Sequence, residues 1–211
     1  MDSYSTIDGC EEYVFEVNRS KFIAVAQSVD SEEEAGKAIE SVKKKYPAAT
    51  HYCFAYTLSP QENIKRFSDD GEPRKTAGMP ILEAITGKNL YSTLVVVARY
   101  FGGTKLGTGG LVRAYSAAAS KAIEKCGTST ARLSVITEVK TDYPYFEAIS
   151  KAVSANGGIS DPQFGDYVKL TACLPVPVSE RILGEIKDIS AGTAEIKIID
   201  KKYCIYKQRL L

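Results

Sequence analysis

The sequence is poor in several residues on which catalytic and metal-binding proteins depend. Its 211 residues include one histidine, no tryptophan and five widely spaced cysteines without a CxxC motif. Any serine or cysteine triad would have to use His51, and neither structural zinc nor a disulfide framework is expected. The longest apolar run, Leu94 to Ala98, is far too short to cross a membrane.

The amino-terminal sequence MDSYSTIDGCEEY is acidic and lacks the apolar core of a secretory signal. The sequence therefore predicts a cytoplasmic protein. With 44% hydrophobic and 25% charged residues, the chain has the composition of a globular protein with room for one large or two small domains.

Charge is balanced overall but unevenly distributed. The formal net charge is +1, yet residues 65–125 hold ten basic and five acidic side chains. Such a segment can create a local positive field that attracts phosphate or an acidic partner. The alternative is that these charges are scattered over a solvated surface.

Hydrophobic periodicity predicts alternating strands and helices in residues 1–130. Ser31 and Glu34 form a capping box at the start of one helix. The predicted elements are a hairpin of residues 12–17 and 21–29 turning at Asn18-Arg19, a helix ending near Pro47, a strand over 50–58, a polar loop, a short helix from Pro80 to Gly87 and a buried strand over 90–101.

A glycine-rich segment, GGTKLGTGG at residues 102–110, follows the most hydrophobic strand and precedes a helix that stops at Gly127. Thr108 stands where a Walker A motif requires lysine, and Val112 stands where a dinucleotide fingerprint requires glycine. The segment can bind an anion through backbone N–H groups, or it can be a tight turn. The candidate anion-binding residues are Gly102, Gly103, Lys105, Gly107, Gly109 and Arg113.

Residues 131–211 form a second predicted domain. Residues 127–132, GTSTAR, are interpreted as a linker. Beyond them the apolar pattern predicts the element order β-α-β-β-α-β, which is typical of a ferredoxin-like domain. The predicted fold class is therefore α+β, with domains at 1–130 and 131–211.

Two further groups of residues could carry chemistry. Asp69, Asp70 and Glu72 could hold a magnesium ion or act as acid and base, although such clusters are usually solvated turns. His51 and Cys53 share one face of the predicted strand, where a base and a nucleophile could cooperate. Incidental packing is the more common outcome for such a pair.

The stretch from Gly78 to Gly107 resembles the signature of the IMPACT, or YigZ, family. The matching residues include Arg99, Tyr100-Phe101, Gly102-Gly103, Leu106 and Gly107. The neighbouring segments FSDDGEPRKTAGMPIL and GTGGLVRAYSAAA also resemble members of this family. The resemblance extends over nearly the whole chain and matches the two-domain form of bacterial members.

The resemblance implies a first domain similar to the second domain of ribosomal protein S-five. It also implies a second domain similar to domain V of elongation factor G. Eukaryotic members regulate translation, and the role proposed for bacterial members is nucleic-acid or ribosome binding. The resemblance thus implies that the partner is RNA or the ribosome. A protein of the translation machinery is a further possible partner, and no cofactor is expected.

The sequence leaves three hypotheses of function. The preferred one is a non-enzymatic module that binds RNA or the ribosome through phosphate contacts from Arg66, Arg74, Lys75, Arg99, Lys105 and Arg113. A phosphate-binding enzyme would require the Asp69–Glu72 loop and the Gly102–Gly110 loop to converge on one pocket. A protein-binding adaptor would instead expose an apolar patch.

Overall fold

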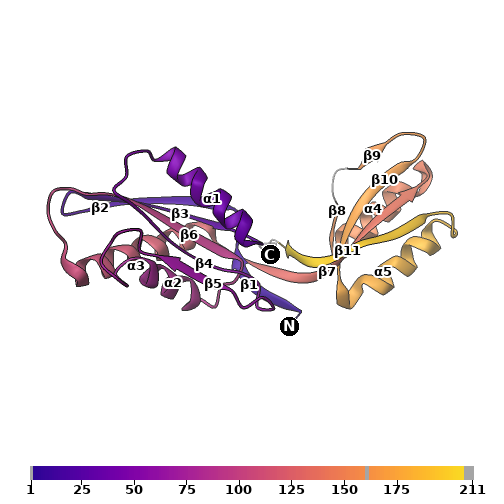
Figure 1. The fold of residues 1–211 in the computed structure, drawn as a ribbon. Coiled ribbons are helices and arrows are strands. Elements are labelled where there is room, and N and C mark those ends of the chain that lie inside the picture. Colours follow the sequence, from indigo (N-terminus) through magenta and orange to yellow (C-terminus); the bar gives the residue numbers. More distant parts are fainter. Residues whose placement is uncertain (1, 160–161, 207–211) are drawn as a thin grey trace. The chain divides into compact units, whose positions relative to one another are not determined.

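The computed structural model describes residues 2–159 and 162–206 and shows a mixed α+β protein. The chain divides into two compact units, Ser3–Thr130 and Ala131–Tyr206, each with its own sheet and helices (Figure 1). No helix in the described ranges is long and apolar enough to span a membrane.

The first unit is built around a five-stranded sheet with the strand order β2-β3-β6-β4-β5. All neighbouring strands are antiparallel. Asn18 and Arg19 both have positive φ at the predicted hairpin turn, as a tight turn between twisted strands requires. The strands are β2 (Cys10–Val17), β3 (Ser20–Ser28), β6 (Thr93–Tyr100), β4 (His51–Thr57) and β5 (Lys65–Ser68), and a short strand β1 (Ser3–Ile7) precedes them.

Helices cover both faces of this sheet and bury a separate apolar cluster on each. Helix α1 (Glu32–Lys45) packs on one face, and its N-cap Ser31 accepts a hydrogen bond from the backbone N–H of Glu34 as predicted. Helices α2 (Gly78–Thr86) and α3 (Gly107–Cys126) pack on the opposite face. Strand β6 is buried along nearly its whole length because it lies in the centre of the sheet between these layers.

The second unit has the order β-α-β-β-β-α-β, which differs from the predicted β-α-β-β-α-β order in one place. Two short strands, β8 and β9, stand where the sequence predicted a single strand between the first helix and Gly165. Strand β10 pairs antiparallel with β7, β8 and β9, and β11 pairs with β7. Its core is apolar and includes Val139, Ile149, Leu170 and Ile182. The elements are β7 (Thr128–Thr141), α4 (Tyr143–Asn156), β8 (Gly158–Ile159), β9 (Gln163–Phe164), β10 (Val168–Pro175), α5 (Val176–Ile189) and β11 (Glu195–Tyr206).

Four other local expectations differ from the structure. The predicted polar loop contains β5, and Gly107, Gly109 and Gly110 belong to the first turn of α3 rather than to a loop. The predicted linker is largely the start of β7, whose buried residues Ser129 and Ala131 are too small to show a hydrophobic pattern. One disulfide joins the half-buried Cys173 and Cys204, which lie 31 residues apart and come together only through the sheet.

Candidate functional site

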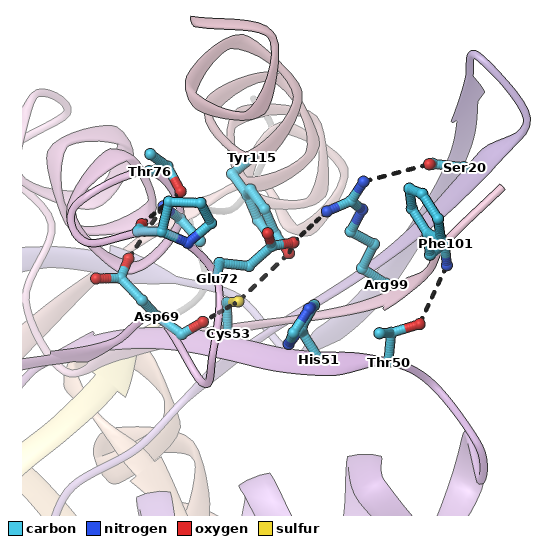
Figure 2. A network of polar contacts seen from close by, with 12 residues as sticks. Ser20, Thr50, His51, Cys53, Asp69, Glu72, Thr76, Arg99, Phe101 and Tyr115 are labelled. Atoms are coloured by element: carbon cyan, nitrogen blue, oxygen red, sulfur yellow. Dashed lines mark hydrogen bonds and ion pairs between the residues drawn. The ribbon is translucent and has the colours of Figure 1, made fainter. Parts of the chain in front are cut away.

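The candidate site is centred on Arg99, near the carboxyl end of β6. In the sheet, Arg99 lies opposite His51 of β4 on one side and opposite Phe22 of β3 on the other. Phe22 and Cys53 belong to the apolar cluster beneath α2 and α3. The Arg99 side chain therefore extends from the sheet toward this helical layer, where Figure 2 shows it beside Glu72 and Tyr115.

A buried ion pair holds the guanidinium of Arg99. Its Nη1 donates to Oε1 of Glu72 at 2.5 Å, and the two side chains are only 5% and 3% exposed. Its Nη2 donates to Oγ of Ser20 at 3.4 Å. The guanidinium carbon lies 5.4 and 5.5 Å from the ring centres of Phe22 and Phe101. The carboxylate of Glu72 offsets the cost of burying the positive charge of Arg99, and the two aromatic rings also attract the guanidinium.

Two neutral groups extend this network into the core. The hydroxyl of Tyr115 donates to Oε1 of Glu72 at 2.8 Å, and the thiol of Cys53 lies 3.3 Å from the same hydroxyl. The thiol also donates to the backbone carbonyl of Asp69 at 3.0 Å. Burial raises the pKa of Cys53 and of Tyr115 far above their ordinary values. Cys53 is thus a protonated thiol and not an activated nucleophile.

The acidic loop is organised by contacts within the protein. The carboxylate of Asp69 accepts hydrogen bonds from the backbone N–H groups of Lys75, Ala77 and Gly78, at 2.8 to 3.1 Å. Asp70 accepts from the N–H of Tyr52 at 2.6 Å. Among the described residues there is no group of three or more His, Cys, Asp or Glu that could hold a metal ion. The three carboxylates therefore fix the loop through contacts within the protein, and the described residues do not form the magnesium site that the sequence offered as an alternative.

The same loop holds the ring of His51. Its Nδ1 lies 2.6 Å from the backbone carbonyl oxygen of Asp70. Gly71 has φ +86°, and a Cβ there would lie 3.3 Å from the imidazole. A larger residue would be strained and would crowd the ring. The His51–Cys53 pair is therefore not a coupled base and nucleophile, because the ring contacts the loop while the thiol faces Tyr115.

The glycine-rich segment adjoins the turn between β2 and β3. A Cβ on Gly102 would lie 2.0 Å from the carbonyl carbon of Arg19, so only glycine fits this close approach. The N–H of Gly102 donates to Oγ of Ser20, which also accepts from Arg99. Gly103 has φ +81°, which glycine adopts without strain. The buried network and the exposed segment thus share Ser20.

The backbone N–H groups in the first turn of α3 are not capped by the N-cap side chain and have no acidic residue beside them in that turn. The helix begins at Gly107, its N-cap Leu106 provides no side-chain hydrogen bond, and its first turn contains no acidic residue. Nη1 of Arg113 lies 3.6 Å from the position of a Cβ on Gly109, so this guanidinium lies over the start of the helix. Both features favour a negative charge at this end of α3.

The predicted phosphate-contacting cations fall into three groups. Arg99 is buried and ion-paired, so it is not a surface cation. Arg66 is exposed, and its Nε lies 3.3 Å from Glu32. The remaining four, Arg74, Lys75, Lys105 and Arg113, are exposed and form no ion pair with any described residue.

Three residues of the site were missed in the sequence. Arg19 is an exposed cation beside Gly102, Ser20 is completely buried, and Tyr115 is a buried residue of α3. The pattern identified Arg19 only as a turn residue and Tyr115 only as part of an apolar stripe. Their polar contacts join residues 43 to 82 positions apart, and periodicity carries no signal for such contacts.

Comparisons with known proteins agree on one family. The model of the Impact N-terminal domain matches residues 18–123. The chain is 38% identical to the IMPACT family member YvyE of Bacillus subtilis over 71% of this chain and 69% of that protein. It is 32% identical to the IMPACT family member YigZ of Escherichia coli over 89% of this chain and 94% of the relative. A solved structure described as a hypothetical protein has 30% identity and a TM-score of 0.65, covering 95% of this chain and 98% of that one.

Proposed function

We propose that this chain, which belongs to the IMPACT family, binds structured RNA or the ribosome in the cytoplasm. It does so without being an enzyme, and this binding regulates translation. One observation carries the proposal. The exposed cations Arg74, Lys75, Lys105 and Arg113, joined by Arg19, form no ion pair with any described residue. Cations left free of carboxylates are available to neutralise phosphates. We call these five residues the basic surface.

The surrounding fold supports this use of the basic surface. Arg19, Lys105 and Arg113 adjoin the glycine-rich segment, where the amino-terminal end of α3 favours an anion. Arg74 and Lys75 belong to the loop that Glu72 fastens to Arg99. The basic surface is therefore attached to a rigid core by a buried ion pair. Contacts of this kind position a nucleic acid and do not read its sequence.

The proposal includes the finer fold relationships. The first unit would be similar to the second domain of ribosomal protein S-five, and the second unit to elongation factor G domain V. Both similarities point to a partner in the translation machinery. The phosphotransfer alternative loses its support, because Asp69, Asp70 and Glu72 are committed to contacts within the protein.

The test is co-sedimentation of the full chain with ribosomes and separate subunits at low and moderate salt. Wild type is compared with Lys105→Glu/Arg113→Glu. Wild type should sediment at low salt and be released as salt rises. The double variant should lose binding at moderate salt. Any binding that is left at low salt should depend on salt less steeply, with a logarithmic slope shallower by about one for each phosphate contact removed.

The matched control is Lys44→Glu/Lys187→Glu, which makes the same change in net charge at exposed residues of α1 and α5. Like Lys105 and Arg113, these two lysines form no ion pair with any described residue. This control should sediment like wild type. The free energy of unfolding of both double variants should differ from that of wild type by no more than about 1 kcal/mol, because exposed charges contribute little to stability. Equal, salt-dependent binding by all three proteins would refute the basic surface as the binding site.

A further inference from the structure

A cavity of about 630 Å³ runs along one side of helix α4 in the second unit. Phe146, Ser150 and Ser154 line it at four-residue spacing, and Glu147 and Lys151 form a second row beside them. Phe146 and Ser150 are half-buried, and the other three side chains are exposed. Sites for small ligands typically enclose about 300–1,000 Å³. This α4 cavity is therefore open to solvent and has room for a nucleotide.

Two exposed aromatic rings adjoin the α4 cavity. Phe164 of β9 lies edge-on to Phe146, with ring centres 5.6 Å apart, and stacks on Tyr143, with ring centres 6.3 Å apart. Phe164 is 61% exposed and Tyr143 is 52% exposed. The Tyr143 hydroxyl donates to the backbone carbonyl of Gly165 at 2.8 Å, which ties the start of α4 to the segment that carries Phe164. The rings are therefore held in place while most of the Phe164 side chain stays open to solvent.

The two charged side chains that line the α4 cavity are not paired with each other. Glu147 and Lys151 are four residues apart on one helix, a spacing at which opposite charges commonly form an ion pair. Neither is ion-paired within the described ranges of the chain, whereas Glu185 and Arg181 pair at the same spacing on α5. The ammonium and the carboxylate are thus both available to a ligand in the cavity.

We propose that the α4 cavity binds a segment of single-stranded RNA, an inference that rests on the RNA-binding function proposed above and adds a second surface to it. Each group at the cavity suits one part of a nucleotide. The ring of Phe164 can stack on a base, the Glu147 carboxylate can accept hydrogen bonds from ribose hydroxyls, and the Lys151 ammonium can bind a phosphate. The centre of an interface with a protein is instead depleted of charged residues.

Two features distinguish the α4 cavity from the basic surface. Its one lysine lies in the same cavity as a carboxylate, so stacking contributes more to the affinity than charge does. The bases of a duplex are stacked on one another and cannot lie against Phe164, whereas the bases of a single strand can. The basic surface contacts the phosphates of either form. The α4 cavity therefore selects unpaired nucleotides, which the basic surface does not.

The test is the binding of a short fluorescent strand of adenosines to the full chain, measured by fluorescence anisotropy at a series of salt concentrations. The same strand paired with its complement provides the comparison. Both RNAs are also tested with Lys105→Glu/Arg113→Glu, which keeps the α4 cavity and removes two cations of the basic surface. In that variant the single strand should still bind, and it should bind more tightly than the duplex.

The variant that removes stacking is Phe164→Ala. Its matched control is Ile198→Ala, because Ile198 of β11 is also 61% exposed and does not line the cavity. Phe164→Ala should bind the single strand about tenfold more weakly at every salt concentration, the loss expected for one base stacked on an aromatic ring. Ile198→Ala should bind like wild type, and Phe164→Tyr, which keeps a ring, should bind nearly as well. All three variants should unfold at nearly the same temperature as wild type.

The variant that removes the phosphate contact is Lys151→Gln. The logarithmic slope of its affinity against salt should be shallower by about 0.7, the value for one phosphate contact on a single strand. Phe164→Ala should leave this slope unchanged, so the two roles are separable. Failure of wild type to bind the single strand, or equal binding by wild type and Phe164→Ala, would overturn the proposal.

Failure of this proposal is distinct from failure of the proposed function. Phe164→Ala keeps every residue of the basic surface and should still sediment with ribosomes. Sedimentation with ribosomes but no binding of the single strand would refute the cavity and leave the basic surface standing. Binding of the single strand that depends on Phe164, without sedimentation, would refute the ribosome and leave the cavity standing.

Discussion

The two units build their cores in different ways. The core of the second unit is formed by apolar side chains, and its buried polar residues in the described range are serines and threonines. In the first unit, the cluster beneath α2 and α3 adjoins a buried glutamate and a buried arginine, Glu72 and Arg99. Both units fold around sheets covered by helices, so a buried charge pair is not a requirement of such a fold.

The difference indicates what the charge pair is for. A well-packed apolar pair is often as stable as a buried ion pair, so stability alone does not explain why two charges are buried here. Here the pair joins four separate segments, because Arg99 of β6 contacts Glu72 of the loop and Ser20 of β3, and Glu72 accepts from Tyr115 of α3. The pair fixes the exposed loop and the glycine-rich segment relative to one another.

The largest expected effect comes from breaking this pair. Glu72→Ala leaves the guanidinium of Arg99 buried without its counter-charge, and we expect a loss of about 3–5 kcal/mol in the free energy of unfolding. Hydrogen exchange should locate the loss in the first unit and leave the amides of β10 protected as in wild type. The measurement is urea unfolding followed by circular dichroism.

A double variant, Glu72→Gln/Arg99→Met, removes both charges and so makes the core of the first unit more like the apolar core of the second unit. It should regain much of the stability lost in Glu72→Ala, since no buried charge remains unpaired. It should nevertheless bind ribosomes more weakly, because the loop is no longer held by the pair. Stability that stays as low as in Glu72→Ala would show that the charges themselves stabilise the unit.

An intermediate effect is expected from Asp69, whose carboxylate accepts the N–H groups at the start of α2. Asp69→Ala leaves those donors without a partner, and hydrogen bonds to a charged group predict a loss of about 2–3 kcal/mol. Asp69→Asn keeps one acceptor oxygen and should lose less. Faster hydrogen exchange confined to residues 69–80 would confirm the local role, whereas an unchanged exchange pattern would refute it.

The smallest expected effect is the alkaline loss of stability that comes from the buried thiol of Cys126 in the first unit. Burial raises the pKa of Cys126 to about 11. The folded state therefore holds this proton more tightly than the unfolded state, whose thiol titrates near pH 8.5. The stabilisation is complete below that value and is lost as the pH rises toward 11. Cys173 and Cys204 form a disulfide and contribute no such loss in the second unit.

Urea unfolding at pH 8 and pH 10 measures this difference. The free energy of unfolding of wild type should fall more between the two values than that of Cys126→Ala, which lacks the thiol. The comparison uses the change with pH and not the absolute stability, which the substitution also alters. An equal fall in both proteins would assign the alkaline loss to other groups.

Local patterns in the sequence determined most of the secondary structure. The Asn18-Arg19 turn, the Ser31 cap and the buried strand β6 depend on residues adjacent in the chain, and each was predicted. Strand β5 was missed because it is short and exposed, and the start of β7 was missed because its buried residues are small. The glycine-rich segment was recognised, but the point at which it becomes helical was not.

Tertiary structure alone decided the roles of the charged residues. Sequence grouped Arg99 with the exposed cations and Glu72 with a solvated acidic turn, yet the two are buried against each other across 27 positions. Local pattern specifies which face of a strand or helix a residue occupies, because that depends on backbone periodicity. Whether a charge meets solvent or a counter-charge depends on how distant segments pack, and only the folded chain determines that.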